Sequence, residues 1–161
     1  MTVTAYLSLG SNVGDRAANL REALERLHSA GKVGAVSSLY ETEPIEFTEQ
    51  PWFLNCVVEL ETDLGPAQLL AGILEIEEQM GRHREKKKGP RNIDLDILFY
   101  GDEIVDGPEL TIPHPAMQER RFVLEPLAEI APGVTHPTSK KTVRELLESL
   151  SAGQVVKKIT A

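Results

Sequence analysis

The stretch Gly89-Pro90-Arg91-Asn92-Ile93-Asp94-Leu95-Asp96-Ile97-Leu98-Phe99-Tyr100 predicts a β-strand that carries two carboxylates. Gly-Pro marks a turn, and the apolar and β-branched residues that follow are typical of a strand. Successive strand side chains alternate between faces, so the apolar side chains share one face and the polar ones the other. The apolar face would comprise Ile93, Leu95, Ile97 and Phe99. The polar face would comprise Asn92, Asp94 and Asp96.

Asp94 and Asp96 form a candidate metal site. Two carboxylates at this strand spacing lie roughly 7 Å apart. At an effective dielectric constant of 20 they repel by about 2 kcal/mol, and a bound divalent cation would turn this repulsion into attraction. Hard oxygen ligands suit Mg²⁺ rather than zinc, and Mg²⁺ usually binds together with phosphate. The alternative is a solvent-facing edge strand whose charges discourage aggregation.

A basic segment directly precedes this strand. Residues 82–91 contain six Lys and Arg against one acid, Glu85, a local charge of plus five in a chain of formal net charge −8. Phosphoryl transfer needs carboxylates that hold a metal and basic side chains that neutralise the remaining phosphate oxygens. Arg82 and Arg91 flank the segment and are the candidates for this role, whereas residues 85–88 are interpreted as a solvated charge run.

Composition bounds the class of protein. With 161 residues, 41% hydrophobic and 26% charged, the chain is expected to form one domain, residues 1–161, with a substantial core. Five per cent aromatic residues and a pI near 5.0 argue against a nucleic-acid binder. The one cysteine, Cys56, excludes an intrachain disulfide framework and fits a reducing cytosol. Neither a signal peptide nor a membrane span is expected, because no basic n-region or stretch of about 20 apolar residues occurs.

Periodicity and punctuation predict the other elements. Alternation indicates strands over residues 2–9, 33–40 and 53–61, with shorter ones at 104–105 and 155–159. Helical spacing predicts helices over residues 16–28 and 66–80, and a capping box, Thr142-Val143-Arg144-Glu145, begins a third helix that ends near residue 150. The glycine-rich turn at residues 10–15 either cradles phosphate or is a tight connection; it lacks the ending of a P-loop.

Phe53 and Asn55 are candidates for binding a flat heterocycle. In the strand over residues 53–61, one face holds Leu54, Cys56, Val58 and Leu60 and is expected to face the core. The other, non-core face holds Phe53, Asn55, Val57 and Glu59. Phe53 could stack on a heterocycle while the amide of Asn55 reads donors and acceptors along its edge. The alternative is a packed phenylalanine and a turn-forming asparagine.

Two further side chains leave alternatives open. Glu77 is centred in the apolar stripe of the second helix, where a lone carboxylate is costly to bury. It either pairs with Arg82 or Arg84, or orients a ligand. His114 stands between two prolines and either presents an imidazole donor to an anion or is an ordinary surface histidine.

Four motifs together closely resemble the 6-hydroxymethyl-7,8-dihydropterin pyrophosphokinase family of folate biosynthesis. They are Leu9-Gly10-Ser11-Asn12, Gly81-Arg82-His83-Arg84, the run from Gly89 to Asp96, and Ile112-Pro113-His114-Pro115. The resemblance covers nearly the whole chain, and its Gly-Pro-Arg-x-x-Asp-x-Asp run is highly specific. The length matches the stand-alone form, without the dihydropteroate synthase domain fused in some organisms. Lys88 departs from the pattern, because well-known members carry tryptophan there.

The resemblance implies an α+β, ferredoxin-like fold, with an antiparallel sheet and helices packed on both faces. It implies transfer of pyrophosphate from ATP to the hydroxymethyl oxygen of the pterin, with release of AMP. A pair of Mg²⁺ ions would bind with ATP at Asp94 and Asp96, and the catalytic residues would be Arg82, Arg91 and Asp96. The implied enzyme is a cytoplasmic monomer that binds neither nucleic acid nor membrane.

The resemblance also implies two sets of binding residues. Those for ATP would be Glu77, Arg82, Arg84, Arg91, Ile97, Thr111, His114 and Arg120. Those for the pterin would be Thr42, Pro44, Ile45, Phe53, Asn55, Asp94 and Phe122.

Two rival classes stay open on the residues alone. Another metal-dependent nucleotidyl or glycosyl transferase could use Asp-x-Asp with basic loops, and its products would not include AMP together with a pterin diphosphate. A non-catalytic ferredoxin-like module would bind pterin or nucleotide without consuming ATP. For the expected enzyme, the general base is either Asp96 or a metal-assisted deprotonation of the alcohol.

Overall fold

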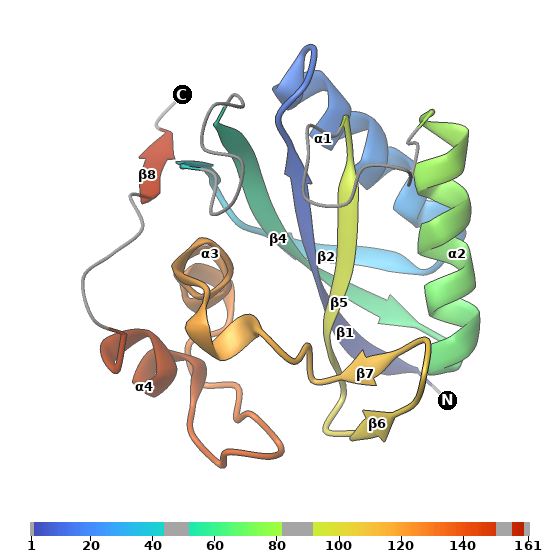
Figure 1. The fold of residues 1–161 in the computed structure, drawn as a ribbon. Coiled ribbons are helices and arrows are strands. Elements are labelled where there is room, and N and C mark those ends of the chain that lie inside the picture. The colour runs from blue at the N-terminus through green and yellow to red at the C-terminus, as the bar shows by residue number, and fades with distance from the viewer. Residues whose placement is uncertain (1, 44–51, 82–91, 151–155, 160–161) are drawn as a thin grey trace.

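The described residues form a six-stranded antiparallel sheet with helices on both faces and a separate two-stranded sheet of β6 (Val105–Asp106) and β7 (Thr111–Ile112) (Figure 1). The structure is a computed structural model, and it describes residues 2–43, 52–81, 92–150 and 156–159. The strands are β1 (Val3–Ser11), β2 (Lys32–Val36), β3 (Leu39–Thr42), β4 (Phe53–Thr62), β5 (Asp94–Tyr100), β6 (Val105–Asp106), β7 (Thr111–Ile112) and β8 (Val156–Ile159). The helices are α1 (Arg16–Arg26), α2 (Pro66–Gln79), α3 (Arg121–Ile130) and α4 (Val143–Glu148), with 3₁₀ turns η1 (Leu27–Ser29) and η2 (Met117–Glu119).

The strand order is that of a ferredoxin-like fold. The strand order in the sheet is β5-β1-β4-β3-β8, and all neighbours are antiparallel. Strand β2 also pairs with β4, further along β4 than β3 does. Up to β5 the chain therefore follows the β-α-β-β-α-β pattern, with β2 and β3 serving as its second strand. The predicted α+β, ferredoxin-like fold is confirmed, and β8 adds an edge strand beside β3 as expected.

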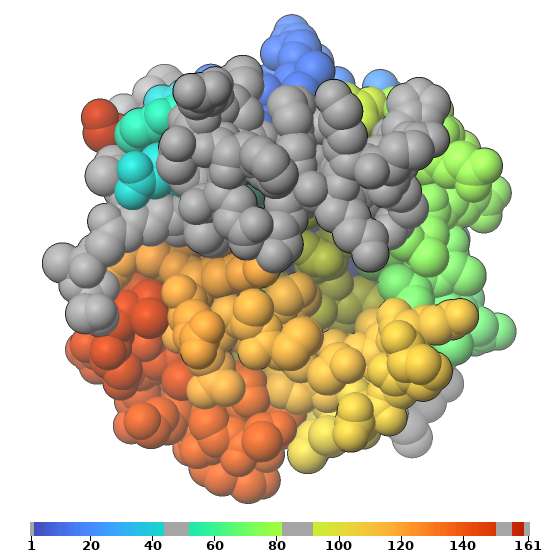
Figure 2. All heavy atoms as spheres, viewed as in Figure 1, coloured from blue at the N-terminus to red at the C-terminus, as the bar shows by residue number. Residues whose placement is uncertain are grey.

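Two apolar cores flank the sheet, because α1 and α2 cover one face and α3 and α4 cover the other (Figure 1). The predicted row of Leu54, Cys56, Val58 and Leu60 lies in the first core. The opposite face was expected to be outside the core, and this is wrong for Val57, which is fully buried in the second core. In the space-filling view, α3, α4 and the β6–β7 hairpin form the lower part of the molecular surface that faces the viewer (Figure 2).

A β-bulge in β5 overturns the predicted position of Phe99. Tyr6 pairs with Phe99 but the next residue, Leu7, pairs with Ile97, so Leu98 is the extra residue. An extra residue shifts the alternation of the side chains beyond it. Ile93, Leu95 and Ile97 therefore lie in the first core as predicted, whereas Phe99 packs in the second core, edge-on against Tyr6 at a centroid distance of 6.4 Å.

The strand predicted over residues 33–40 is divided into β2 and β3. Between them, the carboxylate of Glu129 in α3 accepts hydrogen bonds from the backbone N–H of Ser38 at 3.1 Å and from its hydroxyl at 2.8 Å. Tyr40 donates to the same carboxylate at 2.7 Å. The ladder to β4 is interrupted at Ser37, where the N–H of Val57 donates to the Ser37 hydroxyl at 2.9 Å, which sequence alternation does not reveal.

Side chains cap the starts of two helices, and the cap of α4 is the predicted one. Asp15 accepts the N–H of Ala18 at 3.1 Å at the start of α1, and the capping box of Thr142 and Glu145 opens α4. Helix α3 had no counterpart among the predicted elements. Its internal Pro126 argues against a helix in sequence, but Val123, Leu124, Pro126 and Leu127 bury its apolar face against the sheet.

Folding stability is expected to fall in mild acid because of His136. Burial lowers the pKa of His136, whose Nδ1 accepts the N–H groups of Thr138 and Ser139 at 3.2 and 3.1 Å. An unfolded histidine titrates at about pH 6.5, so stability present above that pH is lost as the pH falls toward the lower folded pKa. Urea unfolding between pH 8 and pH 5 measures the effect.

His136→Asn keeps an acceptor and should weaken this pH dependence of stability. The exposed control His28→Asn should leave the dependence unchanged. Equal slopes of stability against pH for His136→Asn and the native chain would contradict the assignment.

Candidate active site

A row of paired residues crosses four strands on the sheet face that α3 and α4 partly cover. Gly10 of β1 pairs with Asp94 of β5 on one side and with Asn55 of β4 on the other, and Asn55 in turn pairs with Tyr40 of β3. Directly paired residues of an antiparallel sheet project from the same face. One row therefore brings Asp94 and Asn55, predicted for metal and pterin binding, onto the same surface with only Gly10 between them.

Asp96 occupies the next row on the same face. It pairs with Ser8 of β1, which pairs with Val57 of β4. The Asp96 side chain is 39% exposed, whereas Val57 is fully buried. The two carboxylates thus lie where the buried second core gives way to accessible surface, and the predicted shared face of Asp94 and Asp96 is confirmed by the register of β5.

His114 presents a neutral imidazole to these carboxylates. Its Nδ1 accepts the N–H of Ala116 at 3.2 Å, so the ring proton lies on Nε2, 4.0 Å from Oδ1 of Asp96. Burial, and then the charge of Arg120, lower the pKa of His114 to about 4 despite the opposing effect of Asp94. At neutral pH the side chain can therefore donate from Nε2 to an anion without carrying charge, which is the donor role predicted for it.

The backbone around His114 is anchored to β5. The N–H of His114 donates to the carbonyl of Leu98, the bulge residue, at 3.1 Å, and its carbonyl accepts from Met117 at 3.3 Å. The Ile112–Pro113 peptide is cis. Thr111, in β7 just before this turn, is exposed. The turn therefore holds the imidazole against the strand that carries the two aspartates.

Asn55 and Thr42 form a polar pair on the far side of the row. Asn55 is buried and its amide nitrogen donates to the hydroxyl of Thr42 at 2.7 Å. Phe53 pairs with Thr42 and projects from the same face, half-buried. A rigid amide beside an accessible aromatic ring suits an aromatic ligand that carries hydrogen-bonding groups.

Gly10 provides the space in which the Asn55 amide lies. A Cβ added at this position would lie 2.6 Å from Oδ1 of Asn55 and 3.6 Å from Cδ1 of Phe53. Real Cβ atoms do not approach a neighbour to 2.6 Å, so any larger residue must displace the amide. Sequence reasoning placed Gly10 in a turn; it lies within β1, and a glycine inside a strand is the signal for such a close approach.

Gly10→Ala is expected to weaken binding of an aromatic ligand at Asn55 by about fivefold, because loss of one well-placed hydrogen bond is worth about 1 kcal/mol. The substrate KM and direct calorimetric binding measure the effect. Gly72→Ala in α2 is the matched control, since a Cβ there meets nothing within 4 Å. The control should keep the native KM, and an unchanged KM for Gly10→Ala would show that the amide is not used.

Phe122 and Arg120 lie together at the start of α3. The Arg120 guanidinium carbon is 5.5 Å from the centroid of the half-buried Phe122 ring, within the range of a cation–π contact. Arg120 also lies close enough to His114 for its charge to lower the histidine pKa. The predicted ATP contacts Arg120 and His114 are thus brought together, with the predicted pterin contact Phe122 beside them.

Glu77 approaches β5 from the opposite side. It is buried in α2, and its Oε2 accepts the backbone N–H of Leu95 at 2.7 Å. Leu95 is the residue between Asp94 and Asp96, so Glu77 holds the backbone from which both aspartates project. Ile97 is also buried, in the first core, so its side chain faces away from the aspartates and only its backbone is available to a ligand beside them.

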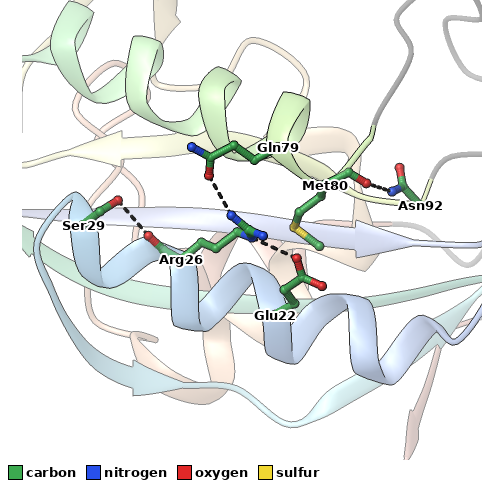
Figure 3. A network of polar contacts seen from close by, with 6 residues as sticks. All are labelled: Glu22, Arg26, Ser29, Gln79, Met80 and Asn92. Carbon is green, nitrogen blue, oxygen red and sulfur yellow. Dashed lines mark hydrogen bonds and ion pairs between the residues drawn. The ribbon is translucent and has the colours of Figure 1, made fainter.

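Asn92 links β5 to the end of α2. Its side-chain amide donates to the carbonyl of Met80 rather than extending the polar face of the strand as predicted (Figure 3). In the same view Arg26 of α1 donates to Gln79 of α2 at 2.8 Å and pairs with Glu22 at 2.9 Å. The Asn92–Met80 hydrogen bond joins the end of α2 to the start of the aspartate strand, whereas the Arg26 contacts only join α1 to α2.

Comparison with known proteins identifies the family and supports the fold. The sequence model of the family described as 7,8-dihydro-6-hydroxymethylpterin-pyrophosphokinase (HPPK) matches residues 6–132. The chain belongs to this family. The HPPK match begins in β1 and ends just after α3, so it includes every described residue predicted to bind ATP or pterin.

Named HPPK relatives cover most of the chain. It is 47% identical over 148 residues to the 2-amino-4-hydroxy-6-hydroxymethyldihydropteridine pyrophosphokinase of Bacillus subtilis, covering 90% of this chain and 89% of the relative. It is 42% identical over 142 residues to the Aquifex aeolicus protein of the same name, covering 88% and 89%. It is also 46% identical over 148 residues to the folic acid synthesis protein fol1 of Schizosaccharomyces pombe, covering 91% of this chain but only 20% of fol1.

Solved HPPK-DHPS structures share the fold. The Plasmodium falciparum HPPK-DHPS crystal structure with pteroate aligns with a TM-score of 0.73 at 21% identity, covering 92% of this chain and 42% of that chain. An HPPK-DHPS structure in complex with substrates gives a TM-score of 0.73 at 17% identity, covering 92% and 43%. The chain thus spans less than half of these proteins. The predicted resemblance to the HPPK family is confirmed.

The donor set of this HPPK chain fits a magnesium ion bound with phosphate. Asp94 and Asp96 supply hard carboxylate oxygens from one face of β5. Among the described residues there is no group of three or more His, Cys, Asp or Glu arranged around a common metal position. Mg²⁺ needs only one or two protein carboxylates when water and phosphate oxygens complete its shell.

Five predicted site residues lie outside the described parts of this HPPK chain: Pro44, Ile45, Arg82, Arg84 and Arg91. Their roles, including a pairing of Glu77 with Arg82 or Arg84, therefore stay predictions. Sequence reasoning did not predict Arg16, which donates to Glu41 in β3 and to the carbonyl of Trp52 directly before β4. The sequence feature that could have indicated Arg16 is its place in the chain. It is the first residue of α1, directly after the N-cap Asp15, where the turn from β1 brings it beside the ends of the neighbouring strands.

Proposed function

We propose that this pyrophosphokinase transfers pyrophosphate from ATP to the hydroxymethyl group of 6-hydroxymethyl-7,8-dihydropterin, giving the pterin diphosphate and AMP in folate biosynthesis. The observation that carries the proposal is the row in which Asp94, Gly10 and Asn55 share one sheet face. A carboxylate suited to a metal–phosphate complex and an amide suited to a heterocycle edge are separated by two strand spacings, about 10 Å.

The pterin would bind at the Asn55 end of this row. Asn55 and Thr42 would read the donors and acceptors of the ring edge, and Phe53 and Phe122 would stack on its two faces. Pro44 and Ile45 are proposed to complete this side through their position after Thr42. Asp94 would meet the hydroxymethyl end of the substrate, because it projects from the same face beyond Gly10.

ATP would bind at the aspartate end. Asp94 and Asp96 would hold a pair of Mg²⁺ ions, which when bound polarise the phosphoryl oxygens and offset their charge. His114 would donate from Nε2 to a phosphate oxygen, with Arg120 nearby. Thr111 and Arg84 complete the proposed nucleotide side, and Ile97 would contribute its backbone. Glu77 would act from the opposite face by holding the N–H of Leu95. Arg82 and Arg91 would contact the transferred group.

The proposed step is an in-line displacement. The hydroxymethyl oxygen forms a bond to the β-phosphorus of ATP as the bond from that phosphorus to the α,β-bridging oxygen breaks, and AMP leaves with the bridging oxygen. The alcohol proton passes to Asp96 or to solvent. Arg82 and Arg91 would offset the charge that develops on the transferred group, and the sheet would hold the alcohol and phosphate in register.

We further propose that residues 1–161 act as one monomeric domain in the cytoplasm without binding nucleic acid. An acidic pI near 5.0 and one free, buried cysteine, Cys56, support this. Within the described ranges, no helix combines the length and hydropathy needed to cross a bilayer.

Product analysis tests the proposed reaction. Purified protein with Mg²⁺, ATP and 6-hydroxymethyl-7,8-dihydropterin should form AMP and pterin diphosphate in equal amounts. Anion-exchange chromatography measures both products. Omitting the pterin should leave ATP intact. ADP as the nucleotide product, or pterin binding without ATP consumption, would contradict the proposal in favour of another transferase or a binding module.

A further inference from the structure

Arg16 joins the start of α1 to both strands that carry the proposed pterin wall. Its Nη2 donates to Oε2 of Glu41 in β3 at 2.9 Å, and its Nη1 donates to the backbone carbonyl of Trp52, just before β4, also at 2.9 Å. The Arg16 and Glu41 side chains are each 31% exposed, so the pair is partly shielded from solvent. One guanidinium therefore fixes two segments that are separate in sequence.

The two positions that Arg16 contacts directly precede Thr42 and Phe53. Thr42 and Phe53 pair across β3 and β4, and Thr42 accepts the hydrogen bond from Asn55. Side chains alternate along a strand, so Glu41 projects toward α1 while Thr42 projects into the site. Arg16 consequently holds the ends of both strands from the face opposite the site.

The same positions are supported from the sheet edge by β8. Glu41 pairs with Lys157, and the Lys157 ammonium lies 5.9 Å from the centroid of the Trp52 ring. Arg16 and Lys157 thus both lie beside Glu41 and Trp52. The polar set of Arg16, Glu41, Trp52 and Lys157 contains no residue predicted to touch either substrate.

We propose that Arg16 is a positioning residue for the pterin side of the site: by joining Glu41 to the Trp52 carbonyl, it sets the register and spacing of Thr42 and Phe53. The inference rests on the proposed function for its kinetic readout. Within the described residues, the side-chain contacts of Arg16 lie on the pterin side, so its loss should act on pterin binding and leave ATP binding largely unchanged.

Arg26 supplies a matched control on the same helix. It also makes two side-chain contacts, to Glu22 and Gln79, but these lie at the other end of α1 and join it to α2 (Figure 3). Arg26→Gln therefore removes an arginine of the same helix without disturbing β3 or β4.

The test compares Arg16→Gln, Arg16→Lys and Arg26→Gln. Loss of two charge-assisted hydrogen bonds should raise the pterin KM about tenfold, whereas the ATP KM should stay within about twofold. Lysine can keep the charge pair but cannot donate in the two directions of the guanidinium, so Arg16→Lys should give an intermediate pterin KM. Arg26→Gln should leave both KM values near native.

Tryptophan emission gives a second readout that needs no turnover. Trp52 is the one tryptophan of the chain, so its emission maximum and anisotropy report on the segment that Arg16 holds. Both should change in Arg16→Gln and remain native in Arg26→Gln. Glu41→Gln, which keeps the shape of the acceptor but removes its charge, provides the same test should Arg16→Gln fail to fold.

The outcomes separate this inference from the proposed reaction. A native protein that forms no AMP contradicts the proposed function, whatever the variants do. A native protein that forms AMP, with an Arg16→Gln variant whose pterin KM and Trp52 emission are native, contradicts the positioning role. Equal rises in both KM values, accompanied by a lower Tm, would assign Arg16 to general stability and also overturn the inference.

Discussion

Asp96→Ala is expected to lower kcat by about a thousandfold or more while the fold persists. Charge stabilisation by a metal at a phosphoryl group is worth several kcal/mol, and about 4 kcal/mol corresponds to roughly 10³ in rate. The fold should survive because the Asp96 side chain is 39% exposed at the surface end of its row and packs in neither core. Steady-state AMP formation and circular dichroism measure the two effects.

Asp102→Asn is the matched control for Asp96. It removes a carboxylate from the exposed turn at the other end of the same strand, and should keep native kcat. Chelation of Mg²⁺ should abolish turnover of the native enzyme, and restored Mg²⁺ should recover it. If Asp96→Ala turns over at a near-native rate with Mg²⁺, the metal assignment is wrong.

Glu77→Ala is expected to reduce both stability and turnover. The buried N–H of Leu95 would lose its acceptor, which costs about 1–3 kcal/mol, and the vacated volume adds a further loss. For a chain of this size the first loss alone lowers Tm by roughly 2–12 °C. Turnover should fall as well, because Leu95 is the backbone between Asp94 and Asp96.

Graded variants separate the hydrogen bond of Glu77 from its bulk. Glu77→Gln retains an acceptor oxygen and should lose less stability than Glu77→Ala, while the exposed neighbour in Glu78→Ala should remain near native. Hydrogen exchange of the Leu95 amide reports the bond directly and should accelerate in Glu77→Ala beyond the change in global stability. Native-like exchange of that amide would show that Glu77 does not hold the strand.

The alternation of side chains along a strand predicted which residues share the face of the candidate site. The alternation of Asp94 and Asp96 with Leu95 holds because one core lies beneath β5 and fixes which face is buried. The same reasoning failed at Phe99, because a bulge is a property of two paired strands and leaves no mark in one of them. Helix α3 was missed for a related reason: its Pro126 lowers helix propensity, and the packing that overrides this comes from a distant part of the chain.

Contacts between distant segments limited the prediction of the polar groups. Glu77 was recognised as a carboxylate that needs a partner, but its acceptance of the Leu95 N–H depends on how α2 lies along the sheet edge. The Asn55–Thr42 bond and the space above Gly10 depend equally on strand register. Residue type indicated which groups needed partners, and only the tertiary arrangement determined which partners they have.

The pairing of β8 with β3 bears on how the protein matures during synthesis. The strands of the β-α-β-β-α-β unit have all been translated once residue 100 is made, so the central sheet can assemble early. Val156, which pairs with Thr42, arrives more than fifty residues later. A nascent chain should therefore acquire a protease-resistant central sheet before β8 pairs with β3. A chain that ends before Val156 should leave β3 as an exposed edge strand.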